Sequence, residues 1–189
     1  LIDHTYLFHS GYDKIKKELV KKDEIISIKS MGWNWGPFRK DVDPLWDYGP
    51  HDLAMCLDLL GEFPEYIQAE ELESVTTSSG IGKMFGIKLK FPTGALARIF
   101  VGNIKKKKRR IFSVKFKDKE IVFDDLSKSK LIVRSDKNNI PVNINDEAPL
   151  RKAVKTFVNG IKGKKDDRLG ADLGVDVIRI LNEVDLLLK

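Results

Sequence analysis

Short runs of alternating apolar and polar residues dominate the middle of the sequence. After Pro64 they follow one another closely, separated by turn residues such as Pro92-Thr93-Gly94. Alternation with period two is typical of strands with one buried face, and tight turns favour antiparallel pairing. We therefore predict strands over residues 66–72, 84–91, 95–101, 110–116, 120–123 and 131–134.

The beginning of the chain has a mixed pattern. We predict a strand over residues 1–8, an amphipathic helix over 12–21 with its lysines outward, and a second strand over 25–31. Residues 31–44 contain several Gly and Pro and are predicted to form a loop. The sequence starts without Met, without a signal peptide and inside a predicted element, so we interpret it as part of a longer chain.

A central apolar helix ends at Leu60, and its starting point decides the chemistry of the preceding residues. If it is helical from about Asp47, that carboxylate and His51 share one face, one turn apart. If it begins at Pro50, Gly49 is the N-cap and Pro50 occupies the first helical position. In both cases His51 is expected in the first turn. There the helix dipole disfavours the imidazolium and leaves a neutral base beside a carboxylate.

Two further helices are predicted at the end of the chain. The first runs from Pro149 to Asn159 and the second covers residues 170–188, with a basic linker between them. Because we find no internal repeat or low-complexity linker, residues 1–189 are expected to form a single domain. The order of elements predicts an α+β fold, with an open, mostly antiparallel β-sheet and helices packed on one face.

The composition is that of an ordinary globular protein, with 42% hydrophobic and 33% charged residues. Three histidines and one cysteine limit metal chemistry, and we expect no metal site. Cys56 cannot form an internal disulfide, which is compatible with a reducing compartment, and a cytoplasmic location is expected. No apolar run approaches the roughly 20 residues that span a bilayer.

A net charge of +6 and the basic run Lys105–Arg110 raise the question of nucleic acid. The rest of the chain lacks the interleaved aromatic and basic residues of known nucleic-acid modules. We therefore favour a solvated hairpin between two strands over a polyanion-binding patch. The glycine-rich residues 80–86 are followed by a strand pattern instead of a helix, so they are interpreted as a flexible turn and not a phosphate loop.

The predicted loop over residues 31–44 carries side chains suited to a ligand. Long loops with two tryptophans are seldom passive, and the rings of Trp33 and Trp35 suit the apolar face of a sugar. Arg39 suits a carboxylate or phosphate. The alternative, that both tryptophans cap a small core, stays open.

Residues 45–53, with the sequence LWDYGPHDL, resemble the signature helix of the Gfo/Idh/MocA oxidoreductases. Residues 3–8, 94–99, 123–126 and 174–181 resemble other parts of the C-terminal half of that family. Ala54 stands where the commoner pattern has an aspartate. Asp52, directly after His51, instead resembles a subgroup that includes nucleotide-sugar 3-dehydrogenases.

The resemblance implies a C-terminal substrate domain of an NAD(P)-dependent oxidoreductase. Such an enzyme oxidises or reduces a hydroxyl or keto group on a sugar, a nucleotide-linked sugar or a polyol. It implies that His51 and Asp47 are catalytic: His51 is the base or a partner of the catalytic lysine, and Asp47 orients and stabilises His51 or binds a substrate hydroxyl. The catalytic lysine and the NAD or NADP site would belong to a Rossmann domain, whose Gly-x-Gly-x-x-Gly and Glu-Lys-Pro motifs are absent from this sequence.

Three further expectations follow from the resemblance. Substrate contacts are predicted for Asn34, Trp35, Arg39 and Tyr6, and a homo-oligomer is predicted through the open sheet face. The chain alone is expected to be inactive without its Rossmann domain. The alternative is a non-catalytic assembly or binding module derived from such a domain, and a polyanion-binding protein is the weaker alternative.

Overall fold

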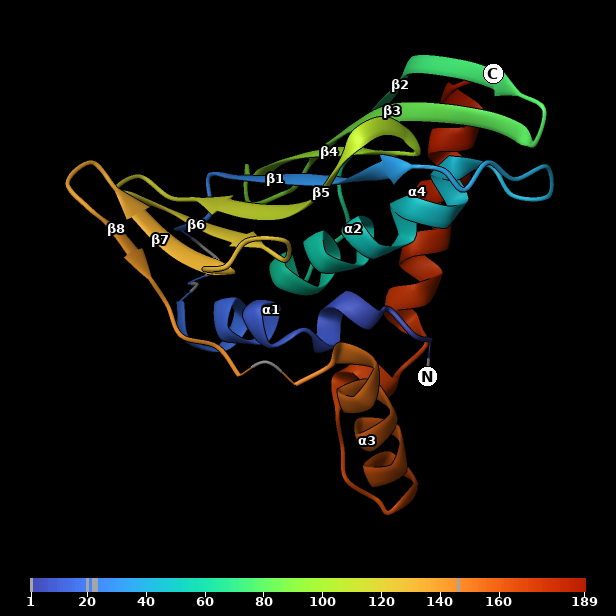
Figure 1. Ribbon diagram of the computed structural model, residues 1–189. Helices are drawn as coiled ribbons and strands as arrows, with labels where there is room; N and C mark the ends of the chain where they lie inside the picture. The colour runs from blue at the N-terminus through green and yellow to red at the C-terminus, as the bar shows by residue number, and fades with distance from the viewer. Residues whose placement is uncertain (1, 20, 22–23, 146) are drawn as a thin grey trace.

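The computed structural model describes residues 2–19, 21, 24–145 and 147–189. Within them, eight strands form one open sheet in the order β2-β3-β4-β1-β5-β6-β7-β8. Among the described strands β1 and β4 pair in parallel, and all other neighbours are antiparallel. Helices lie against one face of this sheet (Figure 1). The predicted α+β fold with an open, mostly antiparallel sheet is confirmed.

The six strands predicted after Pro64 are all present, and most are longer than predicted. Side chains alternate along them, as in β4, where Ala97 and Ile99 are buried and Arg98 is exposed. The edges of the sheet are β2 and β8. The strands are β1 (Ser27–Trp35), β2 (Tyr66–Thr77), β3 (Gly80–Lys90), β4 (Leu96–Gly102), β5 (Ile104–Lys115), β6 (Lys119–Asp124), β7 (Leu131–Ser135) and β8 (Asn139–Pro141).

The helical elements are η1 (Thr5–Phe8), α1 (Ser10–Lys14), η2 (Ile15–Leu19), α2 (Pro44–Leu60), α3 (Pro149–Ile161), η4 (Asp167–Leu169) and α4 (Asp172–Leu187). Both predicted C-terminal helices are confirmed. Figure 1 shows α2 beneath the sheet, α4 crossing near its β2 edge and α3 projecting away from it. None of the described helices combines the length and apolarity that crossing a bilayer requires.

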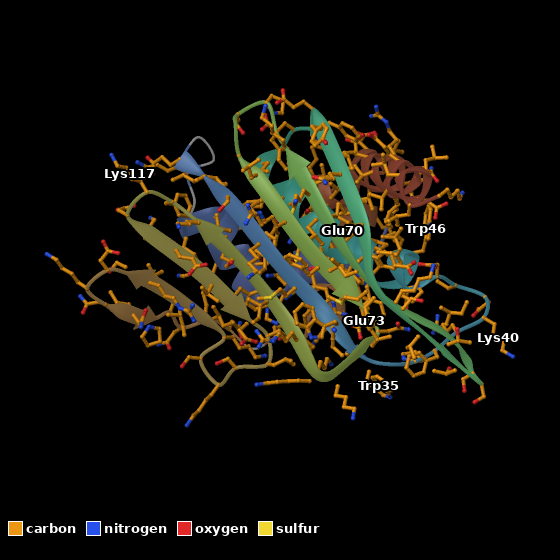
Figure 2. The ribbon with its side chains drawn as sticks, turned by 90° about the horizontal axis from the view of Figure 1, so that it is seen from above. Trp35, Lys40, Trp46, Glu70, Glu73 and Lys117 are labelled. Atoms are coloured by element: carbon orange, nitrogen blue, oxygen red, sulfur yellow. The ribbon has the colours of Figure 1, made fainter. Side chains whose placement is uncertain are left out.

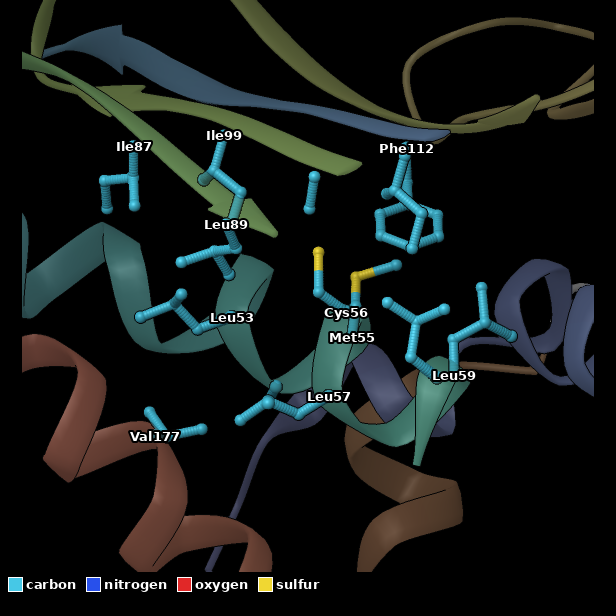
Figure 3. Close-up of a cluster of buried hydrophobic side chains, with 14 of the residues drawn as sticks. Leu53, Met55, Cys56, Leu57, Leu59, Ile87, Leu89, Ile99, Phe112 and Val177 are labelled. Atoms are coloured by element: carbon cyan, nitrogen blue, oxygen red, sulfur yellow. The ribbon is translucent and has the colours of Figure 1, made fainter. Parts of the chain in front are cut away.

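The core lies between the sheet and α2. Leu53 of α2 is fully buried below Ile99 of β4, and Val177 of α4 closes the core from the other side (Figure 3). Cys56 is also fully buried here as a small apolar side chain. Because α2 is apolar on the sides facing the sheet and α4, its polar residues are restricted to a few positions.

Of the two elements predicted at the beginning of the chain, the strand is wrong and the helix is present with an earlier start. Residues 5–8 form a 3₁₀ turn instead of a strand, because Leu7 and Phe8 are both buried, which an alternating strand does not permit. The following helix begins at Ser10, where the His9 side chain accepts the Gly11 N–H as an N-cap. It continues to Leu19, and the remainder of the predicted 12–21 helix includes residue 20, which lies outside the described residues.

The loop predicted from residue 31 also begins too early. Strand β1 continues to Trp35, paired with β4 on one side and β5 on the other. Gly32 is buried inside this strand, although a glycine there reads as a turn signal in the sequence. Strand β1 therefore carries Ser30 and Gly32 beneath the sheet, next to α2.

The glycine-rich residues 80–86 are not a flexible turn. They form the first half of β3, paired along its length with β2, and the turn lies before them at residues 78–79. A Cβ at Gly82 would lie 2.5 Å from the ring of Phe38, so the absence of a side chain permits close packing. The glycines serve the packing of a strand.

The basic run is not a hairpin loop either, because Lys105–Arg110 lies inside β5. Alternation along the strand sends these side chains to both faces. Lys105 pairs with Glu73, Arg109 lies over the ring of Trp33, and Arg110 points beneath the sheet. The charges are therefore divided among separate partners, which weakens the case for a single polyanion-binding patch.

Candidate active site

Helix α2 begins earlier than either predicted start. Asp43 is its N-cap and accepts the Leu45 N–H at 2.9 Å, and Pro44 occupies the first helical position. Pro50 lies inside the helix. His51 is consequently about two turns from the N-terminus, beyond the range of the helix dipole. The expectation that His51 occupies the first turn is wrong.

The pKa of His51 is nevertheless lowered, for a different reason. Burial disfavours the imidazolium most, and the charges of Arg110 and His4 lower the pKa further. The carboxylates of Asp3 and Asp47 act weakly in the opposite direction. Burial, and not the helix dipole, is therefore the reason to expect a neutral imidazole near pH 7.

His51 lines a small cavity beneath the sheet. Its volume is about 20 Å³, and its polar lining comes from four elements: Tyr6 of η1, Ser30 of β1, His51 and Asp52 of α2, and Arg110 of β5. The ring of Tyr6 meets that of His51 edge to face, with centroids 5.5 Å apart. No cluster of metal-ligating side chains occurs among the residues that the structure describes.

Asp52 is a buried carboxylate, with 6% of its surface exposed. The Ser30 hydroxyl donates a hydrogen bond to Oδ1, and Nη1 of Arg110 lies 3.9 Å from Oδ2. Burial raises the pKa of Asp52 to about 6, although the Ser30 hydrogen bond and the Arg110 charge act against this rise. Asp52 is thus an ionisable group whose charge changes just below neutral pH.

Arg110 is held between two tyrosines. Its guanidinium lies 5.4 Å from the ring centre of Tyr6 and 5.3 Å from that of Tyr48. A Cβ at Gly32 would stand 2.5 Å from Nη1 of Arg110 and 2.8 Å from Oδ2 of Asp52. The glycine therefore leaves the space in which this buried ion pair meets.

The predicted site residues do not all gather at this cavity. His51 and Tyr6 line it, whereas Asp47 does not and makes no hydrogen bond with His51. Asn34 instead accepts a hydrogen bond from the Tyr48 hydroxyl. These contacts divide the predicted pair: His51 belongs to the cavity, and the role of Asp47 stays a prediction.

The remaining candidates are Trp35, the last residue of β1, and Arg39, which follows this strand. Trp35 is 51% exposed and meets Phe38 edge to face, with centroids 5.2 Å apart. Arg39 lines a separate hollow of about 450 Å³ that also includes Lys83. Trp33 donates its indole N–H to the Lys107 carbonyl, so neither tryptophan caps the core. Substrate contact by Trp35 and Arg39 stays a prediction.

Sequence reasoning missed Ser30, Asp52 and Arg110 as parts of the cavity. Asp52 follows His51 directly, but in the sequence it was used only as a sign of resemblance to a subgroup of the family and not as a candidate site residue. Ser30 is a polar residue on the buried side of a predicted strand, in phase with Ile28, which is a usable signal. Arg110 closes a basic run, and nothing in the local pattern distinguishes it from its neighbours.

The raised pKa of Asp52 leads to a testable pH dependence. The folded protein keeps the carboxyl protonated up to a pH of about 6, whereas the ordinary value is 3.8. Folding therefore binds protons in this window, and the free energy of unfolding falls as the pH rises through it. Asp52→Asn is expected to remove this fall and to raise stability above pH 6 by up to about 3 kcal/mol. Urea unfolding of the wild type and of Asp52→Asn between pH 4 and pH 8 measures the free energy of unfolding at each pH.

Asp58→Asn is the matched control for this experiment, because it lies on the same helix. The Asp58 carboxylate accepts a hydrogen bond from Tyr12 at 2.7 Å and pairs with Lys16 at 2.6 Å. Its replacement leaves both partners without their acceptor, so the variant is expected to be less stable at pH 7. An Asp52→Asn variant that loses as much stability at pH 7 as Asp58→Asn contradicts the prediction.

Comparison with known proteins identifies the fold. An oxidoreductase proposed for Magnetospirillum magnetotacticum MS-1 matches with a TM-score of 0.87 and 28% identity, over 95% of this chain and 61% of that one. UDP-N-acetylglucosamine 3-dehydrogenase from Acidithiobacillus ferrooxidans matches with a TM-score of 0.83 and 17% identity, over 98% of this chain and 60% of that one. The aldose-aldose oxidoreductase of Caulobacter crescentus matches with a TM-score of 0.80 and 14% identity, over 97% of this chain and 59% of that one.

Neither a protein-family model nor a curated protein sequence matches the chain. The chain spans about three fifths of the length of the solved structures that it resembles. These structures are oxidoreductases of the Gfo/Idh/MocA type, and they support the resemblance seen in residues 45–53 at the level of fold. The nucleotide-sugar subgroup stays a prediction. The chain therefore has a fold that forms the larger part of such oxidoreductases.

Proposed function

We propose that this chain is the substrate domain of an NAD(P)-dependent oxidoreductase. Its substrate is a sugar, a nucleotide-linked sugar or a polyol, of which one hydroxyl or keto group is oxidised or reduced. The observation that carries the proposal is the place of His51. It lies beside a polar cavity in a fold shared with dehydrogenases, one of which acts on a nucleotide sugar.

The chemistry assigned to His51 is proton transfer. Oxidation of a carbinol requires a base near the hydroxyl, and reduction of a ketone requires the corresponding acid. The lowered pKa of His51, caused mainly by burial, keeps the imidazole neutral and able to accept a proton at neutral pH. Of its two ring nitrogens, Nδ1 is buried without a partner among the described residues, so Nε2 is assigned to the substrate.

Among the described residues, the start of α2 does not fit the pyrophosphate of a nicotinamide dinucleotide. Helix α2 follows β1, which takes part in a parallel pair, but its N-terminus is capped by the Asp43 carboxylate. This carboxylate, which also pairs with Lys83 at 2.9 Å, occupies the place where dinucleotide-binding folds accept a phosphate. We assign nucleotide binding to a domain outside these 189 residues.

Calorimetry on this chain tests the assignment of the nucleotide. We expect NAD and NADP to bind with Kd values weaker than about 1 mM, and the chain to lack dehydrogenase activity. A protein that joins the chain to a nucleotide domain is expected to reduce NAD or NADP with a member of a panel of aldoses, inositols and UDP-sugars. Micromolar NAD binding by the chain alone, or an active joined protein that rejects the whole panel, contradicts the proposal.

We also propose that the uncovered sheet face binds a second copy of the chain. Figure 2 looks down on this face, with the helices behind the strands. A hollow of about 320 Å³ on it is lined by residues of both charges, among them Arg109, Glu120 and Arg134. Charges of both signs allow the same surface to be complementary to itself.

A further inference from the structure

Helix α3 presents its apolar side to solvent. Its inner positions hold small or polar residues, among them Lys152, Ala153 and Thr156. Five apolar side chains, 41–72% exposed, lie on the outer side with the spacing of one helix face. We call them the α3 stripe: Leu150, Val154, Phe157, Val158 and Ile161.

Contacts on the inner side fix this orientation of the helix. Ala153 belongs to the core, and the Lys152 ammonium pairs with Asp13 of α1. Asp13 also pairs at 3.2 Å with Arg168 of η4, which donates a hydrogen bond to the Leu7 carbonyl of η1. Turning the stripe inward would break these contacts. A contiguous apolar surface that the fold holds in this way marks an interaction site.

The stripe lies close to the candidate active site. Among the described residues, α3 packs mainly against η1, and Tyr6 of η1 meets the ring of His51 edge to face. Figure 1 shows the N-terminal segment between α3 on one side and α2 on the other. A body that rests on α3 beside η1 is therefore a neighbour of the site at His51.

The size of the stripe favours a domain of the same polypeptide over a separate protein. Stable complexes between separate proteins use about 20–30 residues on each side, whereas the stripe has five. Linked domains associate through smaller surfaces, because the linker keeps them at a high effective concentration. The solved structures with this fold are longer, and the chain spans about three fifths of them.

We propose that the α3 stripe is the surface on which the nucleotide-binding domain of the oxidoreductase docks. The inference rests on the proposed function, which assigns the nucleotide to a domain outside these 189 residues. Docking here holds that domain beside η1 and His51. It also covers the apolar face that this chain leaves open.

The surroundings of the stripe define the chemistry of the matching surface. Arg151 and Lys155 are exposed beside it. At the C-terminal end of α3, a hollow of about 930 Å³ is lined by Phe157, Ile161 and residues 163–167 of the linker. The docking surface of the partner domain is therefore expected to carry apolar side chains that protrude, with acidic residues around them.

Amide hydrogen exchange tests the docking without substrate or nucleotide. It compares the 189-residue chain with a protein that joins the chain to its nucleotide domain. We expect the amides of residues 149–161 to exchange at least about tenfold more slowly in the joined protein, because a docked helix opens less often. The amides at the end of α4 are expected to exchange equally in both proteins.

Two double variants link the slower exchange to the stripe. Val154→Ser/Ile161→Ser removes apolar surface without adding charge, and it is expected to leave the urea midpoint of the 189-residue chain unchanged. In the joined protein it is expected to reduce the slowing to less than about twofold, because apolar burial is lost. The matched control is Leu186→Ser/Leu187→Ser, with similar exposure at the end of α4 near β2, away from α3 (Figure 1). This control is expected to keep the slowing.

Equal exchange of residues 149–161 in the two wild-type proteins overturns the proposal, and so does equal loss of the slowing in both double variants. A basic amphipathic helix also fits an anionic membrane. Binding of the joined protein to vesicles of phosphatidylcholine and phosphatidylserine, lost in Val154→Ser/Ile161→Ser, would assign the stripe to a membrane instead. A dimer of the joined protein that this variant dissociates in sedimentation would assign it to a second copy.

The exchange measurement separates this inference from the proposed function. A joined protein that shows the slowing but rejects every substrate of the panel contradicts the proposed function and supports the docking surface. An active joined protein without slowing at α3 contradicts the docking surface alone.

Discussion

Replacing His51 by asparagine is expected to lower kcat about 10²- to 10⁴-fold in a protein that joins this chain to its nucleotide domain. Asparagine has a comparable polar volume but cannot take up a proton at any ordinary pH. The substrate still binds, so KM is expected to change much less than kcat. Initial rates of NAD or NADP reduction measure both constants.

The pH profile gives this prediction a second readout. The wild-type oxidation rate is expected to fall as the pH drops below the pKa of His51, which burial lowers from 6.5. The variant is expected to lack this fall, because no group titrates in its place. Unchanged turnover in His51→Asn contradicts the assignment.

His9→Asn is the matched control for that variant. His9 is also buried, but its Nε2 lies 3.0 Å from Asp125, and its Nδ1 caps the first helix. Its loss is expected to reduce stability, since both contacts disappear, while kcat stays near the wild-type value. A similar fall in kcat for both histidines would indicate damage to the fold instead of lost proton transfer.

Leu53→Ala is expected to lower the free energy of unfolding by about 2–5 kcal/mol. Leu53 is fully buried, and Figure 3 shows it between the sheet residues Ile87 and Ile99 and the helix α4. Rigid strands above and a helix below leave little freedom to collapse onto the missing side chain, so we expect a cavity to remain. Urea unfolding of the 189-residue chain measures the change.

Leu186→Ala provides the comparison for Leu53. Leu186 lies near the end of α4 and is 70% exposed, so its replacement is expected to change stability by less than about 0.5 kcal/mol. Equal losses in the two variants would contradict the proposed place of the core between α2, the sheet and α4.

The sequence was most informative where burial followed a simple period. Six of the seven strands after Pro64 could be predicted from their apolar runs and the turns between them. The short, exposed strand β8 was missed, and the insertion of β1 between β4 and β5 was not predicted, because pairing between strands distant in the sequence leaves no local signal. Strand β1 was cut short in the prediction because Gly32 reads as a turn residue. In the structure, that glycine makes room for Arg110 and Asp52, which is a long-range requirement that a local pattern does not contain.

The candidate site was predictable only in part. His51 stands out because histidine is scarce and lies close to an aspartate and an aromatic loop. The start of its helix was misplaced because Pro50 resembles a first-turn proline, although Pro44 fills that position. Arg110 comes from a strand far along the chain, and only tertiary structure brings it to α2.

The two edges of the sheet determine how copies of the chain can meet. An unpaired edge strand offers free backbone groups that recruit other strands into aggregates. Strand β2 counters this with Glu70, Glu71 and Glu73 and with a register shift between the last two, while β8 is short and ends at Pro141. Ribbon-like growth by edge pairing is thereby disfavoured, and ordered association is left to the faces.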